Sequence, residues 1–118
     1  MFGIFNKSSA EPVAPGPFGR FVLQEMVASG GMADVWLCTD GHNRAHALRV
    51  MRPEFAAERH ARKRFERGCE ILASVQSHPN VIGYFEHGKV DGHMFCLMEY
   101  VEGANLKELY ARHDPVMT

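Results

Sequence analysis

The stretch that most constrains the fold lies at residues 28–35, which read Ala-Ser-Gly-Gly-Met-Ala-Asp-Val. Apolar runs precede and follow it, a pattern typical of two strands joined by a tight connection. The pair Gly30 and Gly31 suits a plain hairpin turn. It equally suits a loop whose backbone N–H groups approach a phosphate, because both tasks favour residues with little or no side chain. A cationic residue, Arg49, then stands among the apolar residues of the next run.

The pattern along the chain predicts five strands and one long helix. We expect strands near residues 21–27, 35–38 and 45–50, a helix from Pro53 to about Gln76, and a hairpin of residues 81–86 and 94–99. The sequence Asp40-Gly41-His42-Asn43 marks the turn between the second and third strands. Asn105 and Glu108 have the spacing of a helix cap with its reciprocal partner, so a short helix is expected to begin there.

The long helix is predicted to be amphipathic. Its apolar or small residues recur in steps of three and four, at Ala61, Phe65, Gly68, Leu72 and Val75. The other faces carry mixed charges, and pairs such as Arg62 with Glu66 are typical of a solvated surface. A proline in the sequence His78-Pro79-Asn80 ends the helix.

Composition indicates one ordinary soluble globular domain. The chain has 118 residues, 46% of them hydrophobic and 23% charged, with a net charge of -1. This balance gives no reason to expect nucleic acid or an anionic membrane as a partner. No run approaches the roughly 20 apolar residues that span a bilayer. Residues 1–17 are largely small, polar and proline-rich, and they predict a disordered tail before Phe18.

The cysteines and histidines indicate neither disulfides nor a metal site. Cys38, Cys69 and Cys96 are odd in number and widely spaced, so we expect free thiols in the cytoplasm. The histidines pair as His42 with His46 and His87 with His93 around predicted turns. Neither pair has a third ligand nearby, which argues against a metal site.

Four local motifs stand in a consistent order along the chain: Gly19-Arg20-Phe21 through Val35-Trp36, Arg52-Pro53-Glu54, His78-Pro79-Asn80, and Leu97-Met98-Glu99-Tyr100-Val101-Glu102-Gly103. Together with the order of the elements, they resemble the small N-terminal lobe of bacterial serine/threonine protein kinases of the eukaryotic type. The resemblance covers about residues 18–111 and leaves 112–118 as a truncated C-terminal end. It implies an α+β fold in which a five-stranded antiparallel sheet packs against one long helix, followed by a hinge and the start of a helix.

The resemblance also implies an ATP site. Its residues would be Ala28, Ser29, Gly30, Gly31, Met32 and Ala33 in the loop, Val27, Val35, Ala47 and the gatekeeper Met98 around the adenine slot, Arg49 beside the phosphates, and Glu99 and Val101 in the hinge. Backbone groups of the hinge would bond the adenine edge. Magnesium would be bound only when a large lobe is present.

Two positions depart from the family pattern. Arg49 stands where the family has a lysine that contacts the phosphates and pairs with a glutamate of the helix. A guanidinium is a planar fork rather than a compact charge, so the exchange is not conservative. The glutamate would fall at Gly68, and the nearest substitute, Glu70, lies about 200° further round the helix. A bulge in the helix would bring Glu70 back towards the sheet; otherwise the two departures indicate a pseudokinase.

The chain contains neither a His-Arg-Asp nor an Asp-Phe-Gly motif, so it supplies no catalytic residue for phosphoryl transfer. We expect it to be the front portion of a longer kinase-like protein, with a large lobe or a protein partner covering its apolar face. Two functions stay open. One is the ATP-binding part of a serine/threonine protein kinase, and the other is a pseudokinase or scaffold module that binds a partner without phosphoryl transfer.

Overall fold

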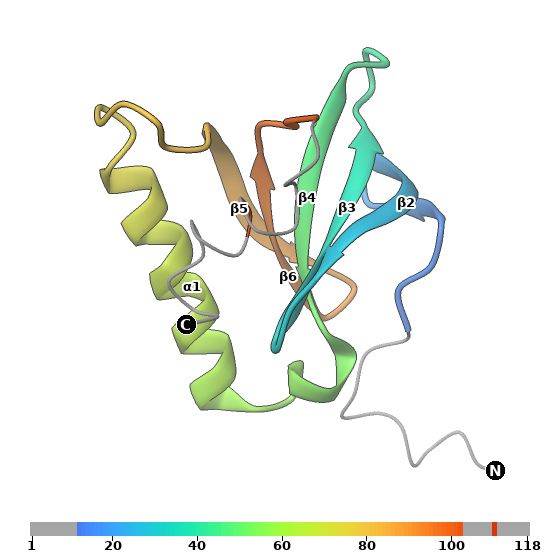
Figure 1. Cartoon of the computed structure of the whole chain (residues 1–118). Helices are drawn as coiled ribbons and strands as arrows, with labels where there is room; N and C mark the ends of the chain where they lie inside the picture. Colours follow the sequence, from blue (N-terminus) through green and yellow to red (C-terminus); the bar gives the residue numbers. More distant parts are fainter. Residues whose placement is uncertain (1–11, 103–109, 111–118) are drawn as a thin grey trace, which may run out of the picture.

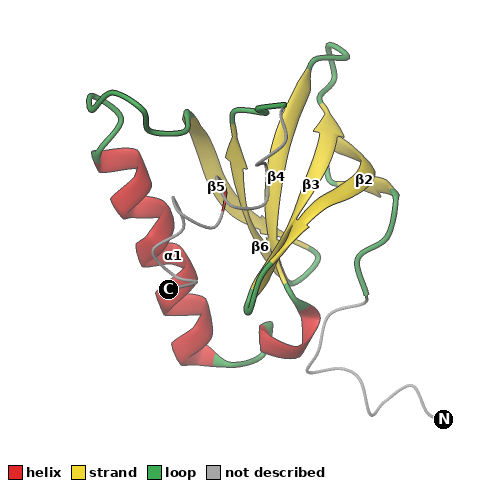
Figure 2. Cartoon of the chain, in the orientation of Figure 1, coloured by secondary structure: helices red, strands yellow, loops and turns green. Residues whose placement is uncertain are grey.

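The computed structural model describes residues 12–102 and Tyr110 (Figures 1 and 2). Its strands are β1 (Gly16–Phe18), β2 (Phe21–Ser29), β3 (Ala33–Thr39), β4 (Ala45–Met51), β5 (Tyr84–Val90) and β6 (His93–Met98). A 3-10 turn at Pro53–Phe55 and the helix α1 (Arg59–Ser74) lie between β4 and β5. The strands form one antiparallel sheet in the order β1-β2-β3-β4-β6-β5, and α1 packs against β5 and β6. The predicted α+β class, an antiparallel sheet with one long helix, is confirmed.

The sheet has six strands rather than the predicted five, because β1 begins inside the segment predicted as a disordered tail. Gly16 pairs with Leu23, and Phe18 pairs with Phe21 across a tight turn. Gly19 makes this turn with a φ of 60°, a conformation that suits glycine. The side chain of Phe18 is buried, so apolar contact holds the short strand in place.

The predicted helix over residues 53–76 is divided in two. The N–H of Phe55 bonds the carbonyl of Arg52, an i to i+3 bond that gives a 3-10 turn instead of an α-helix. Phe55 packs against the core at this point, and Ala56 is buried, so the chain turns before α1 begins at Arg59. The short helix predicted from Asn105 lies outside the described residues, as does the segment 112–118.

The hairpin of β5 and β6 is shifted along the chain relative to its prediction. Its two-residue turn consists of Asp91 and Gly92, with φ of 49° and 87°. Two positive φ values in succession are typical of a type I′ turn, which matches the twist of the flanking strands. The first strand therefore runs up to Val90 instead of ending at Glu86.

Residues alternate between the two faces of the sheet, so the strands β2, β3, β4 and β6 each contribute to two separate apolar clusters. The helix-side cluster contains Ala28, Ala33, Val35, Ala47, Met51, Phe65, Leu72, Met94, Cys96 and Met98. The opposite cluster contains Phe18, Phe21, Leu23, Trp36, Cys38, Leu48, Val50, Phe95 and Leu97. Ala47 and Met51 of β4 lie in the first, so Arg49 between them faces α1 as well.

Candidate functional site

Arg49 is buried between the sheet and α1, with a side chain 3% exposed. The strand register sets it beside Val35 of β3 and Cys96 of β6. Its guanidinium carbon lies 4.6 Å from the centre of the Phe65 ring, and Nη2 donates to Sγ of Cys69 at 3.7 Å. The planar cation therefore stacks on an aromatic side chain of the helix, a contact that suits arginine better than lysine.

The inward face of α1 carries no carboxylate in this fully described helix. Its buried residues are Ala61, Phe65, Gly68, Cys69 and Leu72. Gly68 lies between the two residues that contact Arg49, as the predicted helical stripe requires. Glu70 is exposed, and α1 is continuous through this position, so no bulge turns its carboxylate towards the sheet. Gly68 therefore lies on the inward face of α1, as predicted, and no glutamate lies on that face.

The loop between β2 and β3 is a tight turn closed by the bond from the Gly30 N–H to the Ala33 carbonyl at 3.0 Å. Its tip residue, Met32, is buried in the helix-side cluster, and its carbonyl accepts a bond from the Arg52 N–H at 2.8 Å. Gly31 has no left-handed φ, and a Cβ added there would meet no described atom within 4 Å. Neither backbone conformation nor packing against the described residues therefore requires glycine at this position.

Three polar side chains join the base of this loop to the end of β4. Ser29 Oγ donates to Asp34 Oδ1 at 2.7 Å. Arg52 donates to both residues, from Nε to Asp34 Oδ1 at 3.2 Å and from Nη2 to Ser29 Oγ at 2.5 Å. These bonds fix the two strands on either side of the loop relative to each other.

The predicted walls of the adenine slot come together on the helix side of the sheet. Ala47 and Met98 are direct strand partners, and Val35 lies two residues beyond Ala33 on the neighbouring strand. Ala33, Val35, Ala47 and Met98 belong to the helix-side cluster. The half-buried Val27 packs against this cluster. The structure thus brings the predicted wall residues and Arg49 to one face.

The segment after β6 presents backbone groups to this same face. The Glu99 N–H bonds the Gly83 carbonyl, and Glu99 Oε1 accepts the Gly83 N–H at 2.9 Å, which anchors the segment to the start of β5. The Val101 N–H donates to Tyr110 Oη at 2.9 Å, and Tyr110 Oη donates to the Glu99 carbonyl at 3.3 Å. Burial raises the pKa of the Tyr110 hydroxyl, although its bond to Val101 opposes the shift. The phenol therefore keeps the proton that it donates.

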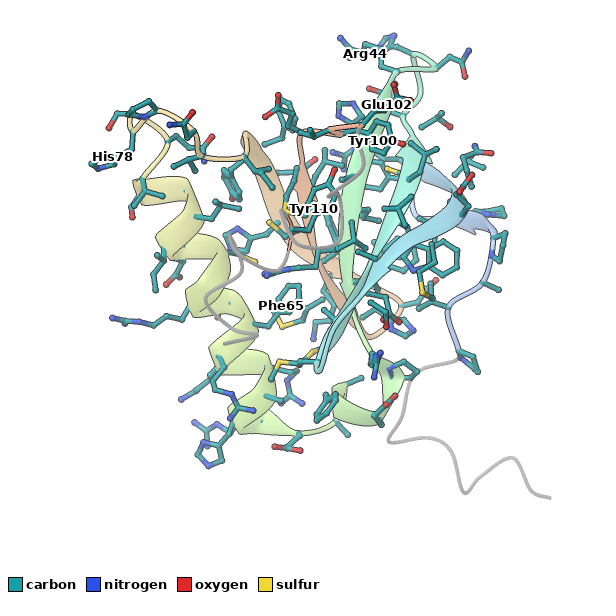
Figure 3. All side chains as sticks on the ribbon, in the orientation of Figure 1. Arg44, Phe65, His78, Tyr100, Glu102 and Tyr110 are labelled. Carbon is teal, nitrogen blue, oxygen red and sulfur yellow. The ribbon has the colours of Figure 1, made fainter. Side chains whose placement is uncertain are left out.

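Sequence reasoning did not identify Tyr110 as a site residue. Figure 3 places its side chain, like that of Phe65, in the space between α1 and the sheet. The Tyr110 hydroxyl bonds backbone groups of Val101 and Glu99, which lie nine and eleven positions earlier in the chain. A periodic sequence pattern does not predict a side-chain contact of this kind. Phe65 and Cys69 were expected only as core or thiol residues, without a role beside Arg49.

Comparisons with known proteins agree with this geometry. No protein-family model matches the chain. The serine/threonine-protein kinase PrkC of Bacillus subtilis is 32% identical over 99 residues, which cover 83% of this chain and 15% of PrkC. PknF of Mycobacterium tuberculosis is 32% identical over 106 residues, covering 88% of this chain and 22% of PknF. The chain thus spans less than a quarter of the length of either kinase.

Solved kinase domains have the same fold over most of the chain. The kinase domain of Mycobacterium tuberculosis PknI superposes with a TM-score of 0.61 at 29% identity, over 79% of this chain and 38% of that structure. The apo form of PpkA-294 gives a TM-score of 0.68 over 85% of this chain and 42% of that structure, and at 21% identity it supports the fold alone. This chain is a protein kinase-like N-terminal lobe. Its homologues are bacterial serine/threonine kinases.

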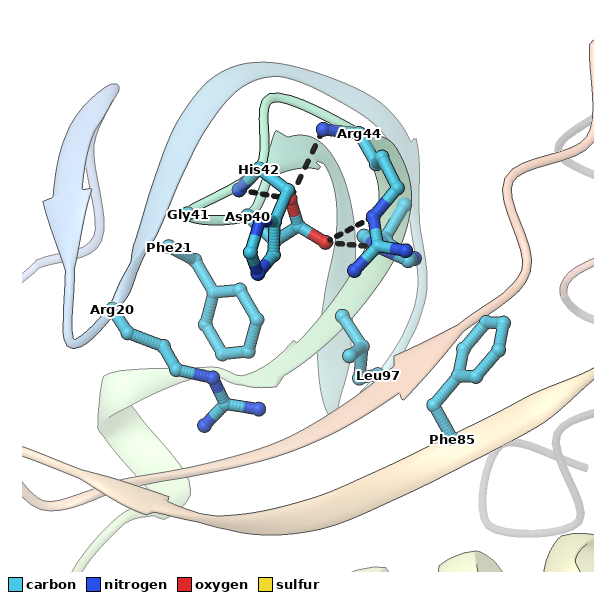
Figure 4. A pocket seen from close by; sticks show the side chains of 9 residues that line it. Arg20, Phe21, Asp40, Gly41, His42, Arg44, Phe85 and Leu97 are labelled. Atoms are coloured by element: carbon cyan, nitrogen blue, oxygen red, sulfur yellow. Dashed lines mark hydrogen bonds and ion pairs between the residues drawn. The ribbon is translucent and has the colours of Figure 1, made fainter.

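The kinase-like lobe has a cavity of about 460 Å³ on the face opposite α1 (Figure 4). Phe21 and Leu97 line it together with Arg20, Arg44 and His46. At its rim Asp40 accepts bonds from the backbone N–H groups of His42 and Arg44 and contacts the His46 ring at 3.0 Å. The Arg44 N–H above all, and then His46, hold the pKa of Asp40 well below its usual range.

Within residues 12–102 and Tyr110, no three His, Cys, Asp or Glu side chains are grouped so that they could hold a metal ion. The same described part contains no helix with the length and apolar character to cross a membrane. Cys38, Cys69 and Cys96 are buried, and none of the three forms a disulfide.

Proposed function

We propose that this lobe binds an adenine nucleotide on the helix-side face, as the nucleotide-binding part of a serine/threonine kinase-like domain. The observation that carries the proposal is the convergence of the Glu99 carbonyl and the Val101 N–H on a single atom, Tyr110 Oη. An acceptor and a donor that converge in this way fit the edge of adenine, which offers a donor beside an acceptor. Small Ala47 and apolar Val35 and Met98 then provide flat walls for the base.

The loop supports the same proposal. Gly31 is not required by its φ or by its described neighbours, so a glycine there is best explained by close approach of a ligand. The bonds among Ser29, Asp34 and Arg52 hold the loop in place for phosphates above Arg49. ATP would bind here with its base at the hinge, and magnesium would be bound only when a large lobe is present.

The nucleotide-binding lobe is proposed to take part in a pseudokinase rather than in efficient phosphoryl transfer. Arg49 is directed onto Phe65 and Cys69 of α1, and the helix offers Gly68 where the family has its glutamate. Transfer requires the cation to be held on the phosphates by that glutamate. Cytoplasmic localisation is part of the proposal and is supported by the absence of a disulfide among Cys38, Cys69 and Cys96.

A second candidate function is a module that binds a protein partner without nucleotide. The burial of Met32 and Tyr110 favours it, because both are packed into the cluster that contains the predicted adenine walls. A partner, or a large kinase lobe, would then bind the exterior of this lobe. The two functions differ in one measurable property, which is the affinity for ATP.

A matched pair of glycine variants tests the proposal. Gly31 and Gly41 both lie in strand connections, have no left-handed φ, and have open space for a Cβ. We expect Gly31→Val to weaken ATP binding to the 118-residue chain about tenfold by calorimetry, since the side chain keeps the backbone from the phosphates, a loss of about 1.4 kcal/mol. Gly41→Val should bind ATP as wild type does. Absence of ATP binding to the wild-type chain, or equal effects of the two variants, would contradict nucleotide binding at this loop.

A further inference from the structure

One oxygen atom satisfies both hinge groups that an adenine base would use. Tyr110 Oη accepts the Val101 N–H at 2.9 Å and donates to the Glu99 carbonyl at 3.3 Å. A phenol hydroxyl carries one donor and two acceptor lone pairs, so it can make both bonds at once. The hinge therefore has its donor and acceptor paired within the chain itself.

The side chain of Tyr110 is buried on the same face as the predicted adenine walls. The residue is 4% exposed, and it belongs to the helix-side cluster that contains Val35, Ala47 and Met98. An aromatic ring between apolar walls, with a polar edge towards the hinge, reproduces the features of a bound purine. Figure 3 shows the side chain in the space between α1 and the sheet.

We propose that Tyr110 occupies the adenine position of this lobe and that a nucleotide must displace it in order to bind. This inference rests on the proposed function, because it concerns regulation of the same slot. The apparent dissociation constant of a ligand equals its intrinsic dissociation constant divided by the fraction of molecules in which the site is open. The two hydrogen bonds of Tyr110 Oη stabilise the closed state, in which the hinge groups are not available to the nucleotide.

Adenosine is the probe that isolates this effect, because it uses the hinge without the phosphate loop. The 118-residue chain would be titrated with adenosine and followed by NMR, as wild type and as Tyr110→Phe. The phenylalanine keeps the ring and the packing but removes the oxygen that bonds Val101 and Glu99. We expect Tyr110→Phe to bind adenosine about tenfold more tightly, since freeing the hinge raises the open fraction. The matched control is Tyr100→Phe, a half-buried tyrosine packed against the same cluster, which should bind as wild type does.

A ligand-free readout separates failure of this inference from failure of the proposed function. The amide proton of Val101 should move much further in Tyr110→Phe than in Tyr100→Phe, because only the first variant loses a hydrogen bond to it. An unchanged Val101 amide, or equal adenosine affinities of wild type and Tyr110→Phe, would overturn the closed slot and leave nucleotide binding standing. If the Val101 amide shifts but no variant binds adenosine, the proposed function fails, and the regulatory role of Tyr110 fails with it.

Discussion

The guanidinium carbon of Arg49 lies 4.6 Å from the centre of the Phe65 ring, in the interior between the sheet and α1. Nη2 of the same arginine contacts Cys69. Phe65 and Cys69 are one helical turn apart on α1. Gly68 lies between them, at the position from which a longer side chain would enter the same space. The guanidinium of Arg49 therefore contacts the face of α1 on which Gly68 lies.

This stacking predicts energetic coupling between Arg49 and Phe65. A double-mutant cycle with Arg49→Met and Phe65→Leu, followed by urea unfolding, should give a coupling free energy of about 1–2 kcal/mol, in the range of a desolvated cation–π contact. Arg67, an exposed arginine of the same helix, supplies the control, and Arg67→Met should show no coupling to Phe65→Leu. Equal coupling free energies of Arg49 and Arg67 with Phe65 would show that the stacking contact does not stabilise the fold specifically.

The side chains at the base of the glycine loop predict a local effect on its dynamics. Asp34→Ala removes the acceptor shared by Ser29 and Arg52, so amide hydrogen exchange in the loop at Gly30 and Gly31 should become several-fold faster. Because the pair of Asp34 with Arg52 is partly exposed, the free energy of unfolding should fall by no more than about 1 kcal/mol. Glu54→Ala, an exposed acid nearby, should leave exchange in the loop unchanged. Equal exchange rates of the loop amides in Asp34→Ala and Glu54→Ala would mean that these bonds do not hold the loop.

Cys38 predicts loss of stability at alkaline pH. Burial, and secondarily the charge of Asp40, raises the pKa of this thiol from 9.0 to about 12. Because the unfolded chain loses the proton at the lower pH, the free energy of unfolding should fall as pH rises above about 9, at up to about 1.4 kcal/mol per pH unit. Urea unfolding at pH 8 and 10.5 measures this slope, and Cys38→Ala should reduce it. An identical slope in wild type and Cys38→Ala would show that the thiol is not the group concerned.

The parts of the site that could be predicted from the sequence are those fixed by a regular period. Alternation along β4 puts Ala47 and Arg49 on one face, and steps of three and four along α1 put Phe65 and Gly68 opposite them. These positions follow from local geometry alone. They are correct although the predicted helix is divided in two and the sheet has a sixth strand.

The parts that could not be predicted depend on contacts outside any period. The composition of the segment that contains β1 is typical of a linker. The strand is stabilised because Phe18 packs into an apolar cluster formed by residues of other strands. Tyr110 reaches the hinge through one hydroxyl, and the stacking of Arg49 on Phe65 depends on the rotamers of both side chains. Such contacts require the tertiary structure to be known.

Nucleotide binding in the helix-side slot can be located by titration of the chain with ATP, followed by amide chemical shifts, because these shifts report where the ligand binds. We predict that the amides of Gly31 and Val101 shift together with a single dissociation constant, while those of Gly41 and His42 at the opposite cavity stay unchanged. Saturable shifts at Gly41 and His42 alone, or no saturable shift at any amide, would contradict the account.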